Sequence, residues 1–457
     1  MHQLKNVIVA GCGLHFKERY YEVLEKLKDK INISLIIDLV SEKEKIEKFF
    51  FDKSFQPSSY VFLPEQYRNN ITPEIINQFI PKNVNLKEID NIIICTEPKA
   101  HKAFAIWAME YNLNVFTDKP ITAFNSYENM DSLYDDFQEL NSYLKKTKVN
   151  FVVSCERRGH LGYKYLKNYI SEIIKETNVP ITFLDIHFGG GLWNMPDEYF
   201  FRENHPHKYG YGILLHSGYH YVDLLINLIS LNKSIFPLSV EESNLKTFIT
   251  NPYTSMNVIN NNVYSKLLKT NRFNQCFEKE NINKMKFYGE NDAMIMGQFK
   301  IGKEVITNYS LKLVERSVTK RSWHILPENT YLKNGRIRQE NVIIHLGPLS
   351  SIHVKSHPYS KLTNTKDLDE DFTIDIMNNQ DLLNKDALIQ LKRSDFSNIF
   401  PELSLKEKMN KKSRQWQLID FLNGGDGNSR LESHEDTIKF LDKIYKNIKE
   451  CNYEIST

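Results

Sequence analysis

The sequence carries little net charge, few cysteines and no long apolar run. Its 59 Lys and Arg residues nearly balance 57 Asp and Glu residues, which leaves a formal net charge of +2. A dedicated nucleic-acid binder normally has a basic excess, so no nucleic-acid partner is expected. No apolar stretch is long enough to span a membrane, so no membrane partner is expected either. The five cysteines are scattered without metal-site spacing, which favours reduced thiols in a cytoplasm.

Internal repeats and a signal-peptide pattern are also missing. The first residues, MHQLKNVIVAGCG, run straight into an apolar strand pattern. We therefore expect a cytoplasmic protein. A chain of 457 residues is too long for one small core. We predict an NAD(P)-binding domain over residues 1–150 and a substrate-binding and oligomerisation domain over 151–457.

The N-terminal pattern is a strand, a glycine turn and a helix. An apolar run over residues 6–10 leads into Gly11-Cys12-Gly13-Leu14-His15-Phe16 and then a helix pattern. In a dinucleotide-binding unit such glycines let backbone amides approach a pyrophosphate at the helix N-terminus. Phe16 replaces the third glycine of G-x-G-x-x-G, which should shift the helix without removing the phosphate site. The alternative for this motif alone is a tight turn.

A second apolar strand over residues 33–37 ends at Asp38, 25 positions past Gly13. An acidic residue at about this place meets the adenosine ribose. A carboxylate there accepts bonds from a 2′-hydroxyl and repels a 2′-phosphate, which favours NAD over NADP. The alternative is an aspartate that starts a turn at a strand end.

Two further strands are predicted at residues 91–95 and 115–116. Strands that alternate with helices indicate a doubly wound parallel sheet, an α/β or Rossmann arrangement, with ligands at the carboxyl ends of the strands. Thr96, Pro98, His101 and Lys119 follow these strands and are expected at that edge.

The remainder predicts an α+β domain with an open, mostly antiparallel sheet. Residues 361–412 are charged and weakly patterned, which fits either helical cover or a mobile lid. A capping pattern at Ser433 and Asp436 predicts a last helix over about residues 433–450. The predicted strands cover residues 181–188, 284–288, 293–301, 304–313, 341–346 and 351–355.

The run FRENHPHKYGYGILLHSGYHYVDLL, residues 201–225, carries the second chemical signal. His216 and His220 are four apart, so they share one face of a regular helix. Lysine and histidine brought into one cleft make a proton-transfer site, and Lys119 is the candidate lysine. The two histidines also have the spacing of a metal pair, but no third ligand is identifiable, so no metal is predicted.

In series, these motifs resemble the Gfo/Idh/MocA family of glucose–fructose oxidoreductases, inositol dehydrogenases and rhizopine-catabolism proteins. The matching pieces are the G-x-G turn, T-x-P-x-x-H at residues 96–101, DKP at 118–120 where the family usually has EKP, ERRGH at 156–160, G-x-G…G-x-H-x-x-D at 210–223, and the terminal helix. The resemblance implies NAD(P)-dependent oxidation or reduction at a carbinol carbon of a sugar, cyclitol or nucleotide sugar. It also implies a second sheet whose outer face mediates oligomerisation, so a homodimer or homotetramer is expected.

The chain departs from the family at three points. His216 stands where the family usually has Asp, and Asp118 is one methylene shorter than the usual Glu. The chain is also longer, with apparent insertions around residues 49–85, 241–280 and 326–412.

The resemblance assigns His220 as the catalytic acid/base, because an imidazole titrates near neutrality. Lys119 is assigned as the positive group that steadies the developing alkoxide. His216 either contacts an acidic group of the substrate or marks an altered or lost reaction. A solvated loop lysine and a structural helix histidine are the alternatives for the first two assignments.

Several other side chains are candidate substrate ligands. Arg157 and Arg158 could hold a carboxylate or phosphate, with solvated structural arginines as the alternative. Trp193, Asn194 and Tyr219 suit a polyol pocket, and Trp193 is equally a core residue. His205 and His207 could enter the cleft or sit on its rim. Two other functions stay open: a non-catalytic NAD-binding sensor, and an NAD-dependent glycoside hydrolase or lyase that uses transient oxidation.

Overall fold

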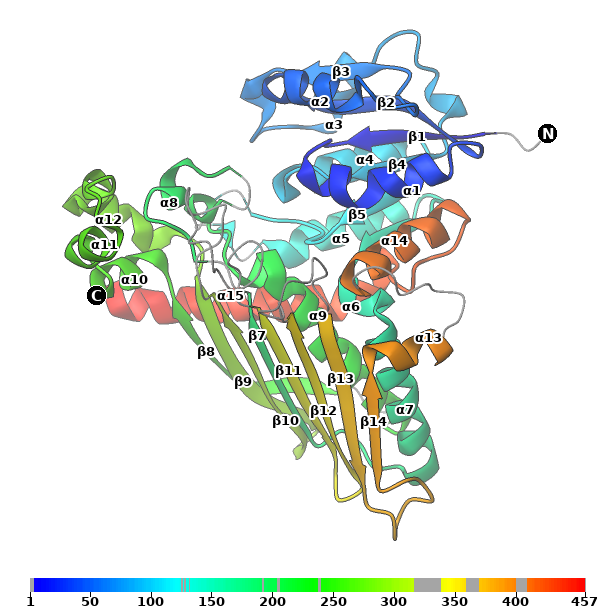
Figure 1. Ribbon diagram of the computed structural model, residues 1–457, viewed down its shortest axis with the longest axis vertical. Helices are drawn as coiled ribbons and strands as arrows, with labels where there is room; N and C mark the ends of the chain where they lie inside the picture. The colour runs from blue at the N-terminus through cyan, green and yellow to red at the C-terminus, as the bar shows by residue number, and fades with distance from the viewer. Residues whose placement is uncertain are drawn as a thin grey trace, which may run out of the picture. The chain divides into compact units, whose positions relative to one another are not determined.

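The structure is a computed structural model, and its chain divides into two compact units (Figure 1). The first unit contains residues 1–125, 132–159 and 410–439, and the second contains residues 126–131, 160–409 and 440–457. The residues described are 4–124, 126, 129–130, 132–190, 193–203, 206–236, 240–315, 338–358, 370–399 and 409–456.

The first unit is built on a six-stranded parallel sheet in the order β3-β2-β1-β4-β5-β6. The strands are β1 (Lys5–Ala10), β2 (Ile31–Leu39), β3 (Tyr60–Leu63), β4 (Asn91–Ile94), β5 (Asn114–Asp118) and β6 (Phe151–Ser154). The order reverses between β1 and β4, and ligands of doubly wound sheets bind at such a point, beyond the carboxyl ends of the strands. The predicted Rossmann architecture is confirmed.

Helices follow most of these strands. They are the π-helical turn η1 (Phe16–Tyr20), α1 (Tyr21–Lys26), α2 (Lys43–Phe50), α3 (Pro73–Phe79), α4 (His101–Glu110), α5 (Leu133–Leu144), α6 (Glu156–Gly159) and α14 (Met409–Leu422). The last of these comes from far along the chain, yet its Leu418 and Phe421 share a core cluster with Val7 of β1 and Phe116 of β5. Helix α14 is therefore part of the core of the first unit.

The second unit contains an eight-stranded sheet in the order β14-β13-β12-β11-β7-β10-β9-β8. The strands are β7 (Phe183–Gly189), β8 (Glu241–Thr250), β9 (Asp292–Ile301), β10 (Glu304–Val314), β11 (Gln339–Leu346), β12 (Ser350–Pro358), β13 (Glu370–Asn378) and β14 (Leu388–Lys392). Only β7 and β10 pair in parallel, and the other neighbours are antiparallel. The predicted mostly antiparallel sheet is confirmed.

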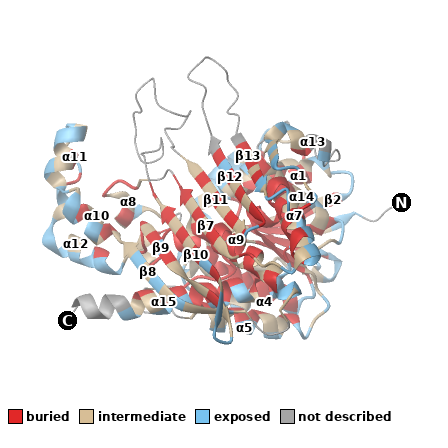
Figure 2. Cartoon of the chain, turned by 90° about the horizontal axis from the view of Figure 1, so that it is seen from below, coloured by how far each residue is buried: buried red, intermediate tan, exposed pale blue. Residues whose placement is uncertain are grey.

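Helices pack on one face of this sheet. Tyr221 stacks on Phe188 of β7 with 4.2 Å between ring centroids, and its hydroxyl donates to the buried carboxylate of Glu340 on β11. Burial alternates along the strands (Figure 2), as expected of a sheet covered on one face. The unit's other helices include α7 (Leu161–Thr177), the π-helical turn η8 (Leu214–Gly218), α9 (Tyr219–Ile229) and α13 (Phe396–Ile399). Smaller clusters of their own contain buried or partly buried residues of α8 (Glu198–Phe201), α10 (Pro252–Val258), α11 (Asn261–Leu268) and α12 (Lys279–Lys284).

Two predictions for this unit are wrong. Residues 284–288 are not a strand: α12 ends at Lys284 and a 3₁₀ turn follows at Met285–Phe287. The alternation of Met285 and Phe287 suits a strand, but Met285 is buried with Tyr199 and Met256 in a small helical core. Within the predicted segment 361–412, the described residues 370–399 are neither helical cover alone nor a lid, because they supply β13 and β14 to the sheet, and residues 361–369 and 400–408 lie outside the described residues.

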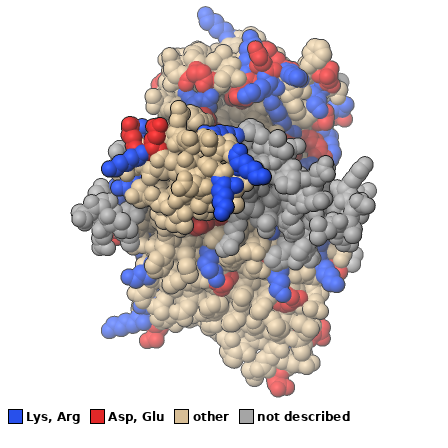
Figure 3. Space-filling view, turned by 60° about the vertical axis from the view of Figure 1, so that its left-hand side comes forward, with Lys and Arg blue, Asp and Glu red and all other residues tan. Residues whose placement is uncertain are grey.

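The last helix, α15 (Glu435–Ser456), begins close to its predicted start. Within the described residues, every helix is too short or too polar to cross a membrane. Acidic and basic side chains are mixed over the face seen in Figure 3, in keeping with the small net charge.

Candidate functional site

The glycine turn after β1 has the geometry of a phosphate cradle. Gly11 adopts a φ of +84°, and a Cβ there would lie 2.6 Å from the backbone of Cys95 and Thr96 at the end of β4. Only glycine allows these two strand ends to approach so closely. At Gly13 a Cβ would meet no described atom within 4 Å, so the backbone faces open space. Leu14 and His15 lead from this turn into η1, and their contact with the pyrophosphate of a dinucleotide stays a prediction.

Asp38, on the neighbouring strand β2, accepts a hydrogen bond from the glycine turn. Its Oδ2 accepts the backbone N–H of Cys12 at 2.7 Å, and its Oδ1 accepts that of Leu39 at 2.7 Å. Burial raises the pKa of Asp38, while these two backbone bonds oppose the rise. The structure thus brings Asp38 to the glycine turn, and its contact with a ribose stays a prediction.

Lys119 lies just beyond β5, where burial lowers its pKa to about 8 and the charge of Arg414 acts in the same direction. Asp118 opposes that effect. Burial would raise the pKa of Asp118 itself, but His15, Tyr20 and Arg414 hold it well below its usual range. The Tyr20 hydroxyl donates to Asp118 at 2.7 Å, and His15 Nε2 lies 3.1 Å from its other oxygen. Asp118 therefore stays ionised, and the neighbouring Lys119 has a pKa of about 8.

Arg414 enters this cluster from α14. Its Nη2 lies 2.7 Å from Oε2 of Glu156, a carboxylate that also pairs with Arg157. Sequence reasoning missed Arg414, because it follows a weakly patterned segment and no motif marks it. Only the packing of α14 on the first sheet brings its charge close enough to act on Lys119.

His101 links the two strand ends nearest Lys119. Its Nδ1 lies 2.8 Å from the carbonyl oxygen of Pro120, and its Nε2 lies 3.1 Å from that of Thr96. Burial lowers the pKa of His101, which favours a neutral ring that donates to one carbonyl. Pro98, also buried, begins the short turn before α4. His101 holds the DKP loop in place, and direct contacts of Thr96, Pro98 and His101 with a cofactor stay predictions.

Arg157 and Arg158 are buried rather than solvated. Nη1 of Arg157 donates to Asn410 at 2.9 Å, and Nη2 of Arg158 donates to the carbonyl of Ser433 at 3.0 Å. These bonds hold residues from the range 410–439 against the rest of the first unit. A contact of either arginine with substrate stays a prediction.

In the second unit, His216 and His220 stand on different kinds of helix. His216 lies in the π-turn η8, in which the Gly218 N–H bonds to the carbonyl of Ile213 at 2.7 Å, and His220 lies in α9 with only 5% of its surface exposed. A Cβ at Gly218 would lie 2.6 Å from that carbonyl, so the wide turn needs glycine. π-Turns of this kind occur frequently at functional sites.

The loop before β9 supports this wide turn. The backbone carbonyl of Glu290 accepts the N–H of Ile213 at 2.9 Å, and its Oε1 accepts the N–H of Leu214 at 2.8 Å. The Tyr445 hydroxyl donates to the same oxygen at 3.3 Å. Burial raises the pKa of Glu290 to about 7. A Cβ at Gly212 would overlap the Glu290 carboxyl, which explains one glycine of the motif.

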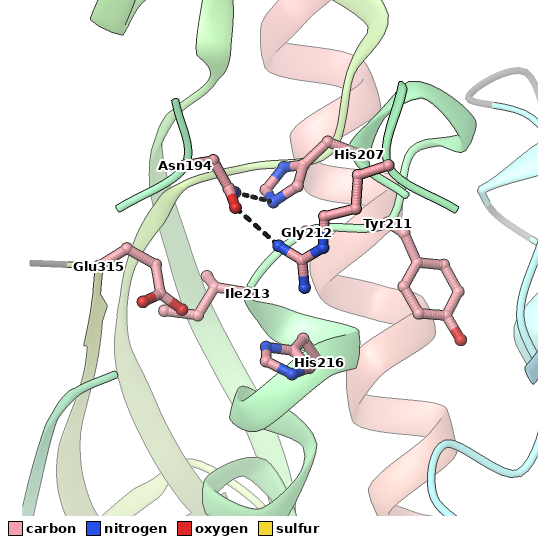
Figure 4. A pocket seen from close by; sticks show the side chains of 8 residues that line it. Asn194, His207, Tyr211, Gly212, Ile213, His216 and Glu315 are labelled. Atoms are coloured by element: carbon pink, nitrogen blue, oxygen red, sulfur yellow. Dashed lines mark hydrogen bonds between the residues drawn. The ribbon is translucent and has the colours of Figure 1, made fainter. Parts of the chain in front are cut away.

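A pocket opens beside His216 within the second unit (Figure 4). Nδ2 of Asn194 donates to His207 Nε2 at 3.0 Å, and Oδ1 of Asn194 accepts from Arg202 at 2.7 Å. The lining consists of Asn194, Arg202, His207, Tyr211, Gly212, Ile213, His216 and Glu315. Arg202, Glu290 and Glu315 were missed from the sequence, because isolated charged residues carry no spacing signal.

Other candidates lie elsewhere. The Trp193 indole N–H donates to Tyr264 at 2.9 Å, and its ring packs on the cluster of Met195, Tyr264 and Phe273. Tyr219 is fully buried at the start of α9. Their contacts with a substrate stay predictions, and His205 lies outside the described residues. Among the parts of the chain that the structure describes, no cluster of three or more His, Cys, Asp or Glu side chains has metal-site geometry.

Comparisons with known proteins agree with the fold described above. The oxidoreductase family model named Gfo/Idh/MocA, NAD-binding Rossmann fold, matches residues 5–150. A comparison with curated protein sequences finds no match.

Solved structures share the fold over nearly the whole chain. The WlbA dehydrogenase of Chromobacterium violaceum, in complex with NADH and UDP-GlcNAcA, has a TM-score of 0.55 and 14% identity, with 98% of this chain and 94% of that chain covered. An oxidoreductase of Agrobacterium radiobacter in complex with NAD+, L-tartaric acid and magnesium has a TM-score of 0.54 and 11% identity, with 97% and 96% covered. The UDP-N-acetylglucosamine 3-dehydrogenase GnnA of Acidithiobacillus ferrooxidans has a TM-score of 0.52 and 10% identity, with 97% and 98% covered.

Proposed function

Because residues 5–150 belong to the Gfo/Idh/MocA oxidoreductase family and carry its NAD-binding Rossmann fold, we propose that this protein is an NAD-dependent oxidoreductase acting on a carbinol carbon. The proposed substrate is a sugar, a cyclitol or a nucleotide-sugar-like compound. The observation that carries the proposal is Lys119, a lysine with a pKa lowered to about 8 at the carboxyl end of β5 in a nucleotide-binding sheet. The UDP-GlcNAcA and L-tartaric acid bound in two of the similar structures, and the name of the UDP-N-acetylglucosamine 3-dehydrogenase, support the substrate class.

The cofactor would be held by the glycine turn, with Leu14 and His15 beside its pyrophosphate and Asp38 at its adenosine ribose. NAD, when bound, supplies the acceptor or donor of the hydride. A carboxylate at residue 38 favours NAD over NADP, because it repels a 2′-phosphate. The backbone N–H groups of Cys12 and Leu39 donate to the Asp38 carboxylate, and these two bonds favour its ionised form.

In the proposed reaction, His220 accepts the hydroxyl proton during oxidation and returns it during reduction. The Lys119 ammonium steadies the oxygen while negative charge develops on it. Burial lowers the pKa of Lys119 to about 8, Arg414 acts in the same direction, and Asp118 opposes both. His216 replaces the family aspartate and is proposed to contact the substrate.

The test is turnover of sugars, cyclitols and nucleotide sugars, read by the absorbance of reduced nicotinamide. His220→Ala and Lys119→Met should each lower kcat by about 10² to 10⁴, while NAD still binds in a calorimetric titration. Lys146→Met, which removes an exposed lysine from the same unit, should leave turnover unchanged. An undiminished rate in His220→Ala would refute the assigned mechanism and favour the NAD-binding sensor. Cofactor that co-purifies and never exchanges would instead favour the transient-oxidation hydrolase or lyase, which recycles its NAD, or the NAD-binding sensor.

We further propose that copies of the chain associate through the outer face of the second sheet. Phe248 of β8 and Met294 of β9 are cross-strand partners and are 58% and 40% exposed. Apolar side chains that adjoin on an exposed sheet face are typical of an interface. A homodimer or homotetramer is the expected assembly.

A further inference from the structure

The pocket beside His216 presents an arginine held at a fixed place. Arg202 follows α8 directly, and its Nη1 donates to Oδ1 of Asn194 at 2.7 Å. Asn194 is itself only 4% exposed. A guanidinium presents its N–H donors in a planar fork that matches a carboxylate, and the bond to Asn194 fixes the direction in which this fork points.

The orientation of Asn194 is set by the residue behind it. His207 Nδ1 donates to the carbonyl oxygen of Gly289 at 2.8 Å, so its Nε2 is the acceptor for the Asn194 amide. Burial lowers the pKa of His207 to about 4, which keeps this ring neutral and its tautomer fixed. The amide oxygen of Asn194 must therefore face Arg202. A side chain fixed in advance loses less entropy when a ligand binds.

The pocket also contains an acceptor for hydroxyl groups. Glu315, at the end of β10, lines it together with His216 (Figure 4). Among the described residues that line the pocket, one carboxylate and one guanidinium balance in charge when the histidines are uncharged. Arg202 supplies the one permanent positive charge of the described lining, which balances a carboxylate monoanion and not a dianionic phosphate. A ligand group that carries one carboxylate and an adjacent hydroxyl would pair with Arg202 and donate to Glu315.

We propose that this pocket receives the carboxylate of a polyhydroxy acid, with Arg202 as its ion-pair partner and Glu315 as the acceptor of a neighbouring hydroxyl. This inference rests on the proposed function, since it narrows the carbinol substrate to a sugar acid. It also gives a reason for His216: an aspartate at that position would place a second negative charge on the pocket wall.

The experiment is calorimetric binding of matched probes in the presence of NAD: gluconate and glucuronate as acids, sorbitol and glucose as their neutral counterparts, and glucose 6-phosphate as the phosphate. The acids should bind at least about tenfold more tightly than the neutral compounds. Arg202→Gln should weaken the acids by about 10- to 100-fold, the value of a charged hydrogen-bonded contact, and leave the neutral compounds unchanged. Arg202→Lys, which keeps the charge and loses the fork, should give a smaller loss and guards against a folding defect.

Two further variants sharpen the result. Arg272→Gln removes a 42% exposed arginine of the same unit that pairs with Asp197, and it should change no affinity. His216→Asp should weaken the acids by about tenfold or more, because it adds a carboxylate to the wall. Equal affinity of the wild type for acids and neutral compounds, or tighter binding of the phosphate, would overturn the proposal.

Binding and turnover separate this proposal from the proposed function. Acids that bind through Arg202 without reduction of NAD would uphold the pocket assignment and refute the oxidoreductase. Neutral sugars that are oxidised equally well by the wild type and by Arg202→Gln would uphold the oxidoreductase and refute the pocket assignment.

Discussion

Replacement of Glu290 by glutamine is expected to stabilise the protein above neutral pH. Glu290 is 3% exposed, and burial raises its pKa from 4.5 to about 7. The folded state therefore binds a proton that the unfolded chain releases, so the free energy of unfolding falls as pH rises from 4.5 to about 7. The shift of roughly 2.5 units, at 1.36 kcal/mol per unit, corresponds to about 3 kcal/mol.

Glutamine resembles the protonated acid in shape and keeps the oxygen that accepts from Leu214 and Tyr445. Glu290→Gln should thus match the wild type near pH 4.5 and exceed it by up to about 3 kcal/mol above pH 7. Urea unfolding across this pH range measures the difference. The control is Glu280→Gln, since Glu280 is an exposed residue whose pKa is lowered by Lys284, and it should show no gain at high pH. A difference between Glu290→Gln and the wild type that does not change with pH would refute the reasoning.

Three further outcomes are expected. Turnover should fall as pH rises through about 8, because Lys119 loses its proton there. The activity that remains in Lys119→Arg should persist to higher pH, because arginine stays protonated. A wild-type profile that is flat to about pH 10 would contradict this. Asp38→Ala should narrow the preference for NAD over NADP in calorimetric titrations, and an unchanged ratio would exclude the ribose contact. Light scattering at micromolar concentration should show a homo-oligomer that Phe248→Glu together with Met294→Glu converts to smaller species, whereas a monomeric wild type would remove the proposed interface.

The sequence by itself determined the class of both sheets and most strand positions. The parallel strands that are buried on both faces read as continuous apolar runs, such as the one at β1, and the glycine turn after it has a known spacing. Both signals are local, because burial and turn geometry act on neighbouring residues. Local signals failed at residues 284–288, where Met285 serves a helical core rather than a strand.

The sequence also brought the chemistry-bearing residues Lys119, His216 and His220 to attention, because their motifs are contiguous. It did not reveal what surrounds them. The π-turn that carries His216 depends on Glu290, which lies more than seventy residues away along the chain.

Only the tertiary structure decided the electrostatic environment of these groups. The pKa of Lys119 depends on Arg414 from α14, and the placement of Arg202 depends on Asn194, His207 and the carbonyl of Gly289. Coulomb energies and desolvation depend on separation in space and on exclusion of water, and neither quantity is encoded by spacing along the chain. The spacing of apolar residues along the sequence predicts which positions are buried, whereas the partners of a buried charge are set when distant segments pack together.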